Sequence, residues 1–178
     1  MSVRQSRRGA LGRHLAAAGT VAVLLSGCAN HPTDAAVVDG TTISESSLQT
    51  TVRAAARALG AAPTDINQRA VLASLVQGAV VDEVAQERGV DVDPRARESL
   101  INTEPQLQAF AADPEAAPLA EALADVALVQ QQLGPEAFSE AFLAVPVTVN
   151  PRYGTWDPTS QEGLTGTGSL SVESYTTP

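Results

Sequence analysis

Apolar residues recur every three or four positions through most of residues 45–144, the spacing that places them on one face of a helix. The first helix is predicted to begin after Ser44, whose hydroxyl can cap it, and to end at Gly60. The longest is predicted to restart at Pro63 and to run to about Arg88. Further helices are expected over 94–103, 106–112 and 113–133, and in a short segment carrying Phe138 and Phe142.

Two short segments instead have the composition of strands, and the second of them also alternates. Residues 35–38 precede the strong turn signal Asp39-Gly40, and residues 145–149 include a proline, which predicts an edge strand. We therefore expect a mainly α domain: a helical bundle of four to six helices, with a small two-stranded β element joining its N- and C-terminal ends. Gly78 lies inside the longest predicted helix, where it costs helix stability and predicts the close approach of a neighbour.

The first 27 residues have the pattern of an export signal. Arginines at the start are followed by the apolar stretch LAAAGTVAVLL (15–25) and then by small residues. The motif Leu25-Ser26-Gly27-Cys28 resembles the lipobox of bacterial lipoproteins, in which the chain is cut before the cysteine and its thiol takes a diacylglyceryl group. The resemblance implies cleavage between Gly27 and Cys28 and lipid attachment at Cys28. An ordinary signal peptide followed by an unpaired cysteine is the alternative.

A lipoprotein signal predicts a protein held on the outer, extracytoplasmic face of the cell membrane. The apolar stretch 15–25 is too short to cross a bilayer as a helix, which takes about 20 residues. Attachment is therefore expected through the lipid alone, and two or more acyl chains hold a protein firmly. The adjacent arginines Arg7 and Arg8 leave the twin-arginine export route open beside the general secretion route.

The remainder of the chain is expected to form three parts. Residues 28–34 are a short polar tether, and residues 35–158 form the helical domain. Residues 159–178 are rich in serine, threonine and glycine, with only scattered apolar side chains. Such a segment cannot bury enough surface to offset the entropy lost on ordering, so it is predicted to be a disordered tail.

Charge narrows the classes of partner. The chain has 20 acidic and 11 basic residues, a formal net charge of −9. Four of the arginines lie in the signal segment, so the processed chain keeps seven arginines against all 20 acids, a formal charge of −13. Nucleic acids are disfavoured as partners because phosphate binding relies on clustered cations. An anionic lipid surface is disfavoured for the same reason, which leaves the lipid anchor as the expected membrane contact.

The residues available for chemistry point away from catalysis. His31, in the tether, is the one histidine after the signal segment, and Cys28 is expected to be alkylated. Serine–histidine and cysteine–histidine catalysis, and zinc sites of histidine and cysteine, are therefore disfavoured. Asp91 and Asp93 lack the other ligands of a calcium loop, and Asp93 before Pro94 is better explained as a helix cap. We expect a protein that is no enzyme and holds no metal or cofactor, with paired-acid glycoside hydrolysis as a residual alternative.

The segment Asn150-Pro151-Arg152-Tyr153-Gly154 is the densest cluster of turn-forming and aromatic residues. One interpretation is structural: the turn is shaped by proline and glycine, while Tyr153 and Trp156 cover the open end of the bundle. The other is functional: Arg152, Tyr153 and Trp156 form an edge that contacts a peptide or glycan, with Arg152 pairing to a carboxylate. The sequence leaves both open.

Three segments carry a resemblance to a known family. AAVVDGTTISESSL (35–48) resembles the start of the SurA N-terminal domain, which occurs in periplasmic and surface foldases beside PrsA-type lipoproteins. QERGVDVDPRARESL (86–100) is similar to the family's helix that ends in Gly-Val before a new capped helix. VTVNPRYGTWDP (147–158) is similar to the closing strand of short SurA-like lipoproteins. The likeness covers about residues 35–158.

The resemblance implies a scaffold that binds polypeptides. The chain has no room for the parvulin prolyl-isomerase domain of SurA and PrsA, so isomerase chemistry is not expected. The function expected from the resemblance is a lipid-anchored, chaperone-like module that binds unfolded or exported polypeptides. The alternative is a structural or adaptor lipoprotein that binds one folded cell-envelope partner, with its acidic surface setting specificity.

Overall fold

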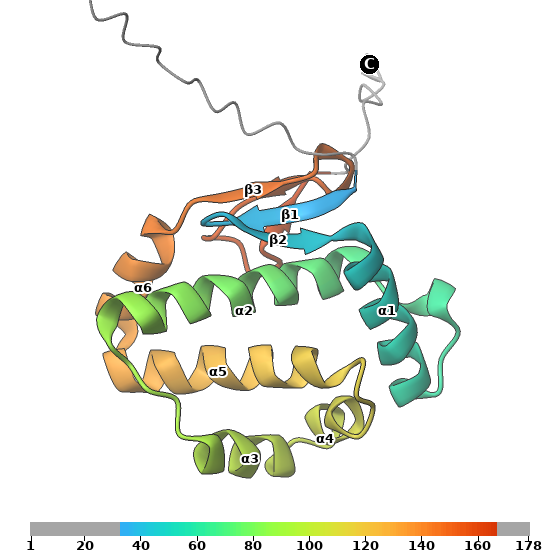
Figure 1. Ribbon diagram of the computed structural model, residues 1–178, viewed down its shortest axis with the longest axis horizontal. Coiled ribbons are helices and arrows are strands. Elements are labelled where there is room, and N and C mark those ends of the chain that lie inside the picture. Colours follow the sequence, from blue (N-terminus) through green and yellow to red (C-terminus); the bar gives the residue numbers. More distant parts are fainter. Residues whose placement is uncertain (1–32, 167–178) are drawn as a thin grey trace, which may run out of the picture.

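Helix α2 (Gln68–Arg88) is the central element of the computed structural model, which describes residues 33–166. Figure 1 shows a small sheet on one side of α2 and helix α5 (Ala117–Leu133) along its other side. Helices α3 (Pro94–Thr103) and α4 (Pro105–Ala111) lie beyond α5. Because α2 is covered on both sides, it buries apolar residues on more than one face: Val71, Leu72, Val76, Val80, Val81 and Val84.

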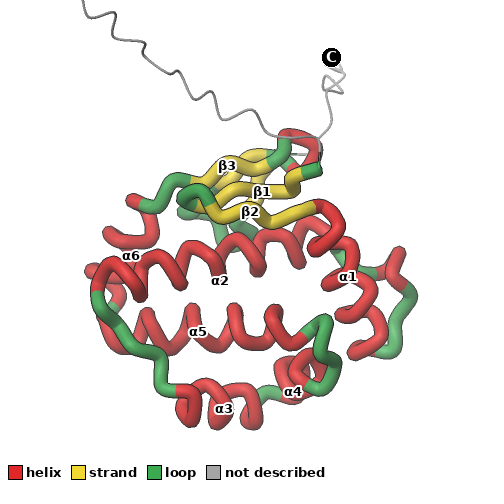
Figure 2. Tube along the Cα trace, in the orientation of Figure 1, coloured by secondary structure: helices red, strands yellow, loops and turns green. Residues whose placement is uncertain are grey.

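The mainly helical class is confirmed. Helix α1 (Glu45–Leu59) packs against α2 and α4, and α6 (Pro135–Ala144) packs against α5 and α2, so the described residues form six α-helices. In Figure 2 helices make up most of the body, and the labelled strands are gathered at one end of the molecule. Proline stands at or near the first position of α3, α4, α5 and α6, where its missing N–H costs no hydrogen bond.

The predicted strand pair exists but is part of a larger sheet. Strand β1 (Asp34–Val38) pairs antiparallel with β3 (Val147–Val149), which brings the two ends of the domain together as expected. The expectation of two strands is corrected to three, because β2 (Thr41–Ser44) pairs with the other side of β1. Asp39 and Gly40 both have positive φ, 42° and 86°, so the chain folds back at once into a hairpin.

Helix α1 begins and ends where the sequence predicted. Ser44 is the N-cap, and its hydroxyl accepts a hydrogen bond of 3.1 Å from the backbone N–H of Ser47. Gly60 closes the helix in the left-handed conformation. The buried face carries Leu48 and Val52 with several alanines.

The predicted starts of α2 and α5 were several residues too early. Pro63 opens a separate 3₁₀ turn, η1 (Pro63–Asp65), and α2 begins only after Asn67, whose side chain accepts from the N–H groups of Arg69 and Ala70. Likewise α5 begins at Ala117, because residues 113–116 form a turn in which the carboxylate of Asp113 accepts from the N–H of Glu115. In both cases a local side-chain bond competes with helix extension.

The predicted close approach at Gly78 is confirmed. A Cβ built on Gly78 would overlap the Cβ of Ala122 on α5 and lie 3.2 Å from its Cα. Helices α2 and α5 therefore touch backbone to backbone at this point, which requires glycine on one side and alanine on the other.

The predicted disordered tail starts too early. After the 3₁₀ turn η2 (Pro151–Tyr153), strands β4 (Thr155–Trp156) and β5 (Leu164–Thr165) pair antiparallel, so residues 159–166 belong to the folded body. Leu164 is 2 % exposed and joins the main core. The burial of this leucine anchors a segment whose composition is otherwise polar. The rest of the tail, 167–178, and the predictions for the signal segment, Cys28 and His31 lie outside the described residues.

Candidate binding surfaces

The predicted edge of Arg152, Tyr153 and Trp156 is engaged within the protein itself. The Tyr153 hydroxyl donates to both carboxylate oxygens of Glu45, at 2.8 and 2.7 Å, and accepts from the Gln68 amide at 3.0 Å. Arg152 pairs with the same carboxylate at 2.8 Å, and its guanidinium lies 5.1 Å from the centre of the Tyr153 ring. The carboxylate partner of Arg152 is thus at the start of α1, in the same chain.

Burial and hydrogen bonding set the protonation of this cluster. Burial raises the pKa of Tyr153 to about 12, and the hydrogen bond to ionised Glu45 acts in the same direction. Burial alone would raise the pKa of Glu45, but hydrogen bonds from Tyr153 and Gln49 and the charge of Arg152 outweigh it, so that pKa is lowered. The pair is therefore a neutral tyrosine and an ionised glutamate over the whole physiological range.

Trp156 and Asn150 complete the join between the sheet and the helices. The Trp156 ring lies 6.1 Å from that of Phe142, which is 5.4 Å from Phe138. The Asn150 side chain donates to the carbonyl of Asp34 and accepts from the N–H of Arg152. Tyr153 is buried, so its ring does not face solvent as a contacting edge would require. These contacts favour the structural interpretation, in which the aromatic residues close the end of the bundle.

An apolar pocket opens where α1, η1, α2, α4 and α5 meet. Its volume is about 240 Å³. Its lining is mainly aliphatic and aromatic: Ala55, Leu59, Ile66, Ala70, Val71, Phe110, Leu119 and Leu123, with Asp65, Asn67, Ser74 and Gln106 among them. Leu59 is 44 % exposed and Leu143 50 %, and these are the exposed large hydrophobic residues of the described chain. Of these two, only Leu59 lines this pocket.

A second recess follows α2 on the side of α3. One hollow of about 370 Å³ lies over the contact of α2 with α5 and is lined by Gly78, Ala79, Ala122 and the charged residues Asp82, Arg97, Glu121 and Asp125. A neighbouring hollow of about 350 Å³ is lined by Ser46, Ser47, Thr50, Thr51 and Glu115. Both hollows have Leu75 and Pro118 in their walls, so they adjoin at these residues, and the two together are called the groove.

The charged residues of this groove centre on a partly buried ion pair. Asp125 is buried in α5, and its two carboxylate oxygens accept from Arg97 Nε and Nη2, each at 2.6 Å. This bidentate pair holds α3 against α5, and α3 itself buries no residue fully. The pKa of Asp82 is raised, first by partial desolvation and then by the negative charge of Asp125. The sequence analysis missed this cluster, although an aspartate within the apolar run ALADVALV (122–129) was a signal for it.

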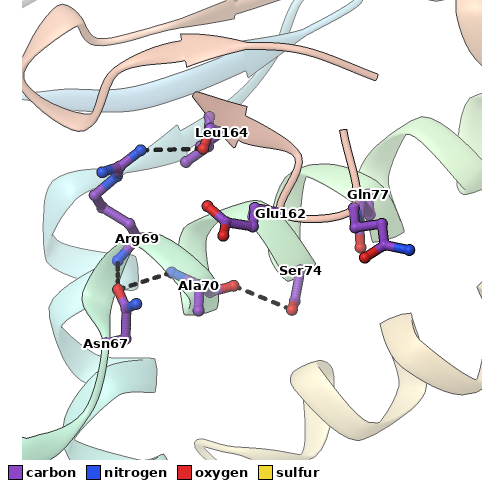
Figure 3. Close-up of a pocket in the computed structure, with 9 residues that line it drawn as sticks. Asn67, Arg69, Ala70, Ser74, Gln77, Glu162 and Leu164 are labelled. Carbon is purple, nitrogen blue, oxygen red and sulfur yellow. Dashed lines mark hydrogen bonds between the residues drawn. The ribbon is translucent and has the colours of Figure 1, made fainter. Parts of the chain in front are cut away.

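A third recess is polar and lies beside the first turns of α2 (Figure 3). Its volume is about 320 Å³. Arg69 donates to the carbonyl of Leu164 at 3.0 Å, and Ser74 donates to the carbonyl of Ala70 at 3.1 Å. Figure 3 shows the carboxylate of Glu162 above these turns. The bond from Arg69 fastens the β5 segment to α2, and those of Asn67 and Ser74 lie within the start of α2, so we assign this recess a structural role.

Among residues 33–166 no group of three or more histidine, cysteine or acidic side chains is placed to hold a metal ion. Asp93 caps α3 by accepting from the N–H of Arg95 at 2.9 Å, which is the capping role expected from its position before Pro94. Within the same range no helix is both long and apolar enough to cross a bilayer.

Comparison with known proteins adds no relative. No protein-family model, curated protein or solved structure matches the chain. Arguments about function therefore rest on the contacts, cavities and charges described above and on the motifs of the sequence.

Proposed function

We propose that the protein is a lipid-anchored adaptor of the cell envelope that binds one partner polypeptide without catalysis. The observation that carries this proposal is the apolar pocket at the junction of α1, α2, α4 and α5, with half-exposed Leu59 at its wall. A volume of about 240 Å³ suits one or two apolar side chains rather than a long unfolded segment.

The scarcity of exposed apolar surface favours a defined partner. A protein that holds many unfolded clients needs a broad apolar surface, and patches above roughly 400 Å² are typical of such contact sites. In the described residues the exposed large hydrophobics are Leu59, on α1, and Leu143, on α6. A single apolar anchor seated in a pocket, surrounded by polar and acidic surface, is typical of recognition of one partner.

Lipid attachment at Cys28 supplies the location in this proposal. The residues between Cys28 and β1 form a tether of a few residues, which would hold the domain close to the membrane. The strong negative charge of the domain disfavours contact with anionic lipid, so its binding surfaces would face proteins of the envelope. Mass spectrometry of the native protein tests the anchor: an unmodified Cys28 behind an intact signal segment would contradict it.

A chaperone-like module for unfolded or exported polypeptides is the second candidate. It rests on the resemblance of residues 35–158 to the SurA N-terminal domain family, and the apolar pocket would be its binding site. In this candidate, clients would be many and binding would tolerate different apolar side chains. The unlipidated protein would then suppress aggregation of an unfolded test protein at several-fold molar excess.

Site-specific crosslinking in cells separates the two candidates. A photo-crosslinking amino acid is placed at position 59, in the pocket wall, or at position 143, an equally exposed leucine outside it. The adaptor proposal expects one dominant crosslinked species from position 59 and none from position 143. A broad smear from position 59 alone would favour the chaperone-like candidate. Identical patterns from both positions would overturn binding at the pocket.

A further inference from the structure

The groove beside α2 consists of two adjoining hollows with different linings. Its two hollows, about 370 and 350 Å³, meet at Leu75 and Pro118, and the groove runs from the start of α1 past the contact of α2 with α5. An extended peptide spans about 3.3 Å per residue, so several residues would lie along adjoining hollows of this size. The groove differs from the apolar pocket in position and in chemistry.

The floor of the groove is low because of the residues at the helix contact. Gly78 has no side chain, and Ala79 and Ala122 present only methyl groups. The same small residues that let α2 and α5 touch therefore leave an apolar trough above the contact. A straight aliphatic chain can lie in such a trough and keep a polar end in water.

One end of the groove carries an excess of negative charge. Asp82, Glu121 and Asp125 face one cation, Arg97, which leaves a net charge of two negatives. Arg97 is committed to Asp125 by two hydrogen bonds of 2.6 Å, whereas Asp82 and Glu121 are exposed and form no ion pair with any residue in 33–166. Desolvation raises the pKa of Asp82, and the negative charges of Asp125 and Glu121 act in the same direction, against the charge of Arg97.

The other end of the groove is lined mainly by hydroxyl groups, together with Glu115, whose carboxylate is paired with Arg57. Ser46, Ser47, Thr50 and Thr51 bring hydroxyls to this hollow. Hydroxyls can donate to and accept from the backbone of an extended peptide. Hydroxyls, a small apolar surface and an acidic end in adjoining hollows match a peptide that carries a cationic side chain. A site for a small inorganic ion would not need the hydroxyls or the apolar surface.

We propose that this groove binds an extended segment of a partner polypeptide and receives a lysine side chain at its acidic end. The lysine stem lies over Gly78, Ala79 and Ala122, and its ammonium group sits between the carboxylates of Asp82 and Glu121. An arginine fork prefers one buried carboxylate in bidentate geometry, a role that Arg97 already fills at Asp125. The chain contains no lysine, so the occupant comes from a different protein.

The inference does not depend on the apolar pocket, although both surfaces could serve one partner. Exposed ion pairs contribute about 0.2–1 kcal/mol each. Two such pairs in the groove correspond to about a two- to thirtyfold change in the dissociation constant, and a five- to tenfold change lies in the middle of that range. The lysine therefore selects the segment, while the rest of the groove supplies the contact area.

An NMR titration of the full chain in non-ionic detergent tests the proposal. The probe is a capped decapeptide of serine and alanine with one central lysine, and its twin has glutamine at that position. We expect saturable shifts of the Ala79 and Ala122 amide signals with the lysine peptide, and at least fivefold weaker binding of the glutamine peptide. Equal binding of the two peptides, or no saturable shift at these amides, would overturn the proposal.

A matched pair of variants locates the charge effect. Asp82→Asn with Glu121→Gln removes two exposed charges from the groove and is expected to weaken the lysine peptide five- to tenfold without affecting the glutamine peptide. Glu136→Gln with Glu140→Gln removes two exposed charges from α6, outside the groove, and is expected to leave both affinities unchanged. Equal weakening by both pairs would mean attraction by overall charge alone and would refute the site.

Lysinamide binding as tightly as the peptide would show a cation site and refute the polypeptide assignment.

Failure of this proposal and failure of the adaptor proposal give different results. The groove variants leave Leu59 and the apolar pocket untouched, so crosslinking from position 59 should persist in them. Loss of the position-59 crosslink with intact lysine-peptide binding would contradict the adaptor proposal alone. Loss of lysine selectivity with an intact crosslink would contradict the groove alone.

Discussion

Tyr153 and Glu45 lie 108 positions apart in the chain, and the tyrosine hydroxyl donates to the glutamate carboxylate at 2.7 and 2.8 Å. Glu45 opens α1, and Tyr153 ends the turn that follows β3. The bond therefore fastens the C-terminal part of the domain to its first helix. The two residues form one partly buried join.

Removal of the Tyr153 hydroxyl should destabilise the domain. Tyr153→Phe keeps the ring but leaves the Glu45 carboxylate and the Gln68 amide without their shared partner. Hydrogen bonds to charged groups contribute about 1.5–3 kcal/mol, and Glu45 keeps some access to water, so we expect a loss of about 1–2 kcal/mol. The loss of unfolding free energy is measured by urea-induced unfolding followed by circular dichroism. Arg152→Gln is the control, because an exposed ion pair should contribute less than about 1 kcal/mol.

The join should weaken in acid. The folded-state pKa of Glu45 is below the ordinary value of 4.5, so its stabilising effect is complete above that value and is lost as the pH falls through the lower, folded-state pKa. The difference in unfolding free energy between the wild type and Glu45→Gln should therefore be present at pH 7 and shrink towards zero near pH 3. A difference that stays constant with pH would show that the loss at Glu45→Gln comes from packing rather than charge.

Much of the fold could be predicted because short-range rules decide it. The caps at Ser44, Gly60 and Asp93 have the predicted partners or conformations, and the prolines stand near the helix starts. The pairing of β1 with β3 was predicted from two apolar segments at the ends of the domain. The small residue Gly78 correctly predicted a helix contact, though not which helix it touches.

Two kinds of side-chain bond could not be predicted in the same way: a local cap that competes with helix extension, and bonds between residues far apart in the chain. The start of α2 depends on Asn67 turning its side chain back onto the helix, a choice that competes with simple extension from Pro63. The pairing of Arg97 with Asp125 depends on where α3 meets α5, which no local pattern encodes. The role of Tyr153 was left open because its partner, Glu45, is supplied by tertiary structure.

Leu164 should be an anchor for the C-terminal hairpin. It is 2 % exposed in the main core although it stands in a polar segment. Leu164→Ala should lower the unfolding free energy by about 2–4 kcal/mol, the usual cost of a buried leucine truncated to alanine. The control is Leu143→Ala, at a position 50 % exposed, where we expect a loss below about 0.5 kcal/mol. Equal effects in urea unfolding would contradict the packing of β5.

Asp82 should oppose stability at neutral pH. The folded-state pKa of Asp82 is raised, so the ionised carboxylate is less favourable in the folded protein than in the unfolded chain. The resulting loss of stability begins as the pH rises past the unfolded-state pKa and is complete above the folded-state pKa. Asp82→Asn should therefore stabilise the domain slightly at pH 7, by no more than about 0.5 kcal/mol for an exposed position, and not at pH 3. Thermal unfolding at both pH values measures the change. Destabilisation at pH 7 would mean that the carboxylate has a structural partner.

The contact of Gly78 with Ala122 should behave as a single packing unit. A methyl group added at Gly78 would overlap the Cβ of Ala122, so Gly78→Ala should cost about 2–3 kcal/mol even though alanine is the better helix former. Ala122→Gly alone should cost about 1 kcal/mol through helix propensity. In the double variant the methyl group has moved from α5 to α2, so the overlap of the two Cβ atoms is gone and the two propensity changes cancel. A tight contact of 3.2 Å between the new Cβ and the Cα of residue 122 remains. We therefore expect its unfolding free energy to lie within about 1 kcal/mol of the wild type. Additive losses in this double-mutant cycle would refute the direct contact, and with it the low floor on which the groove depends.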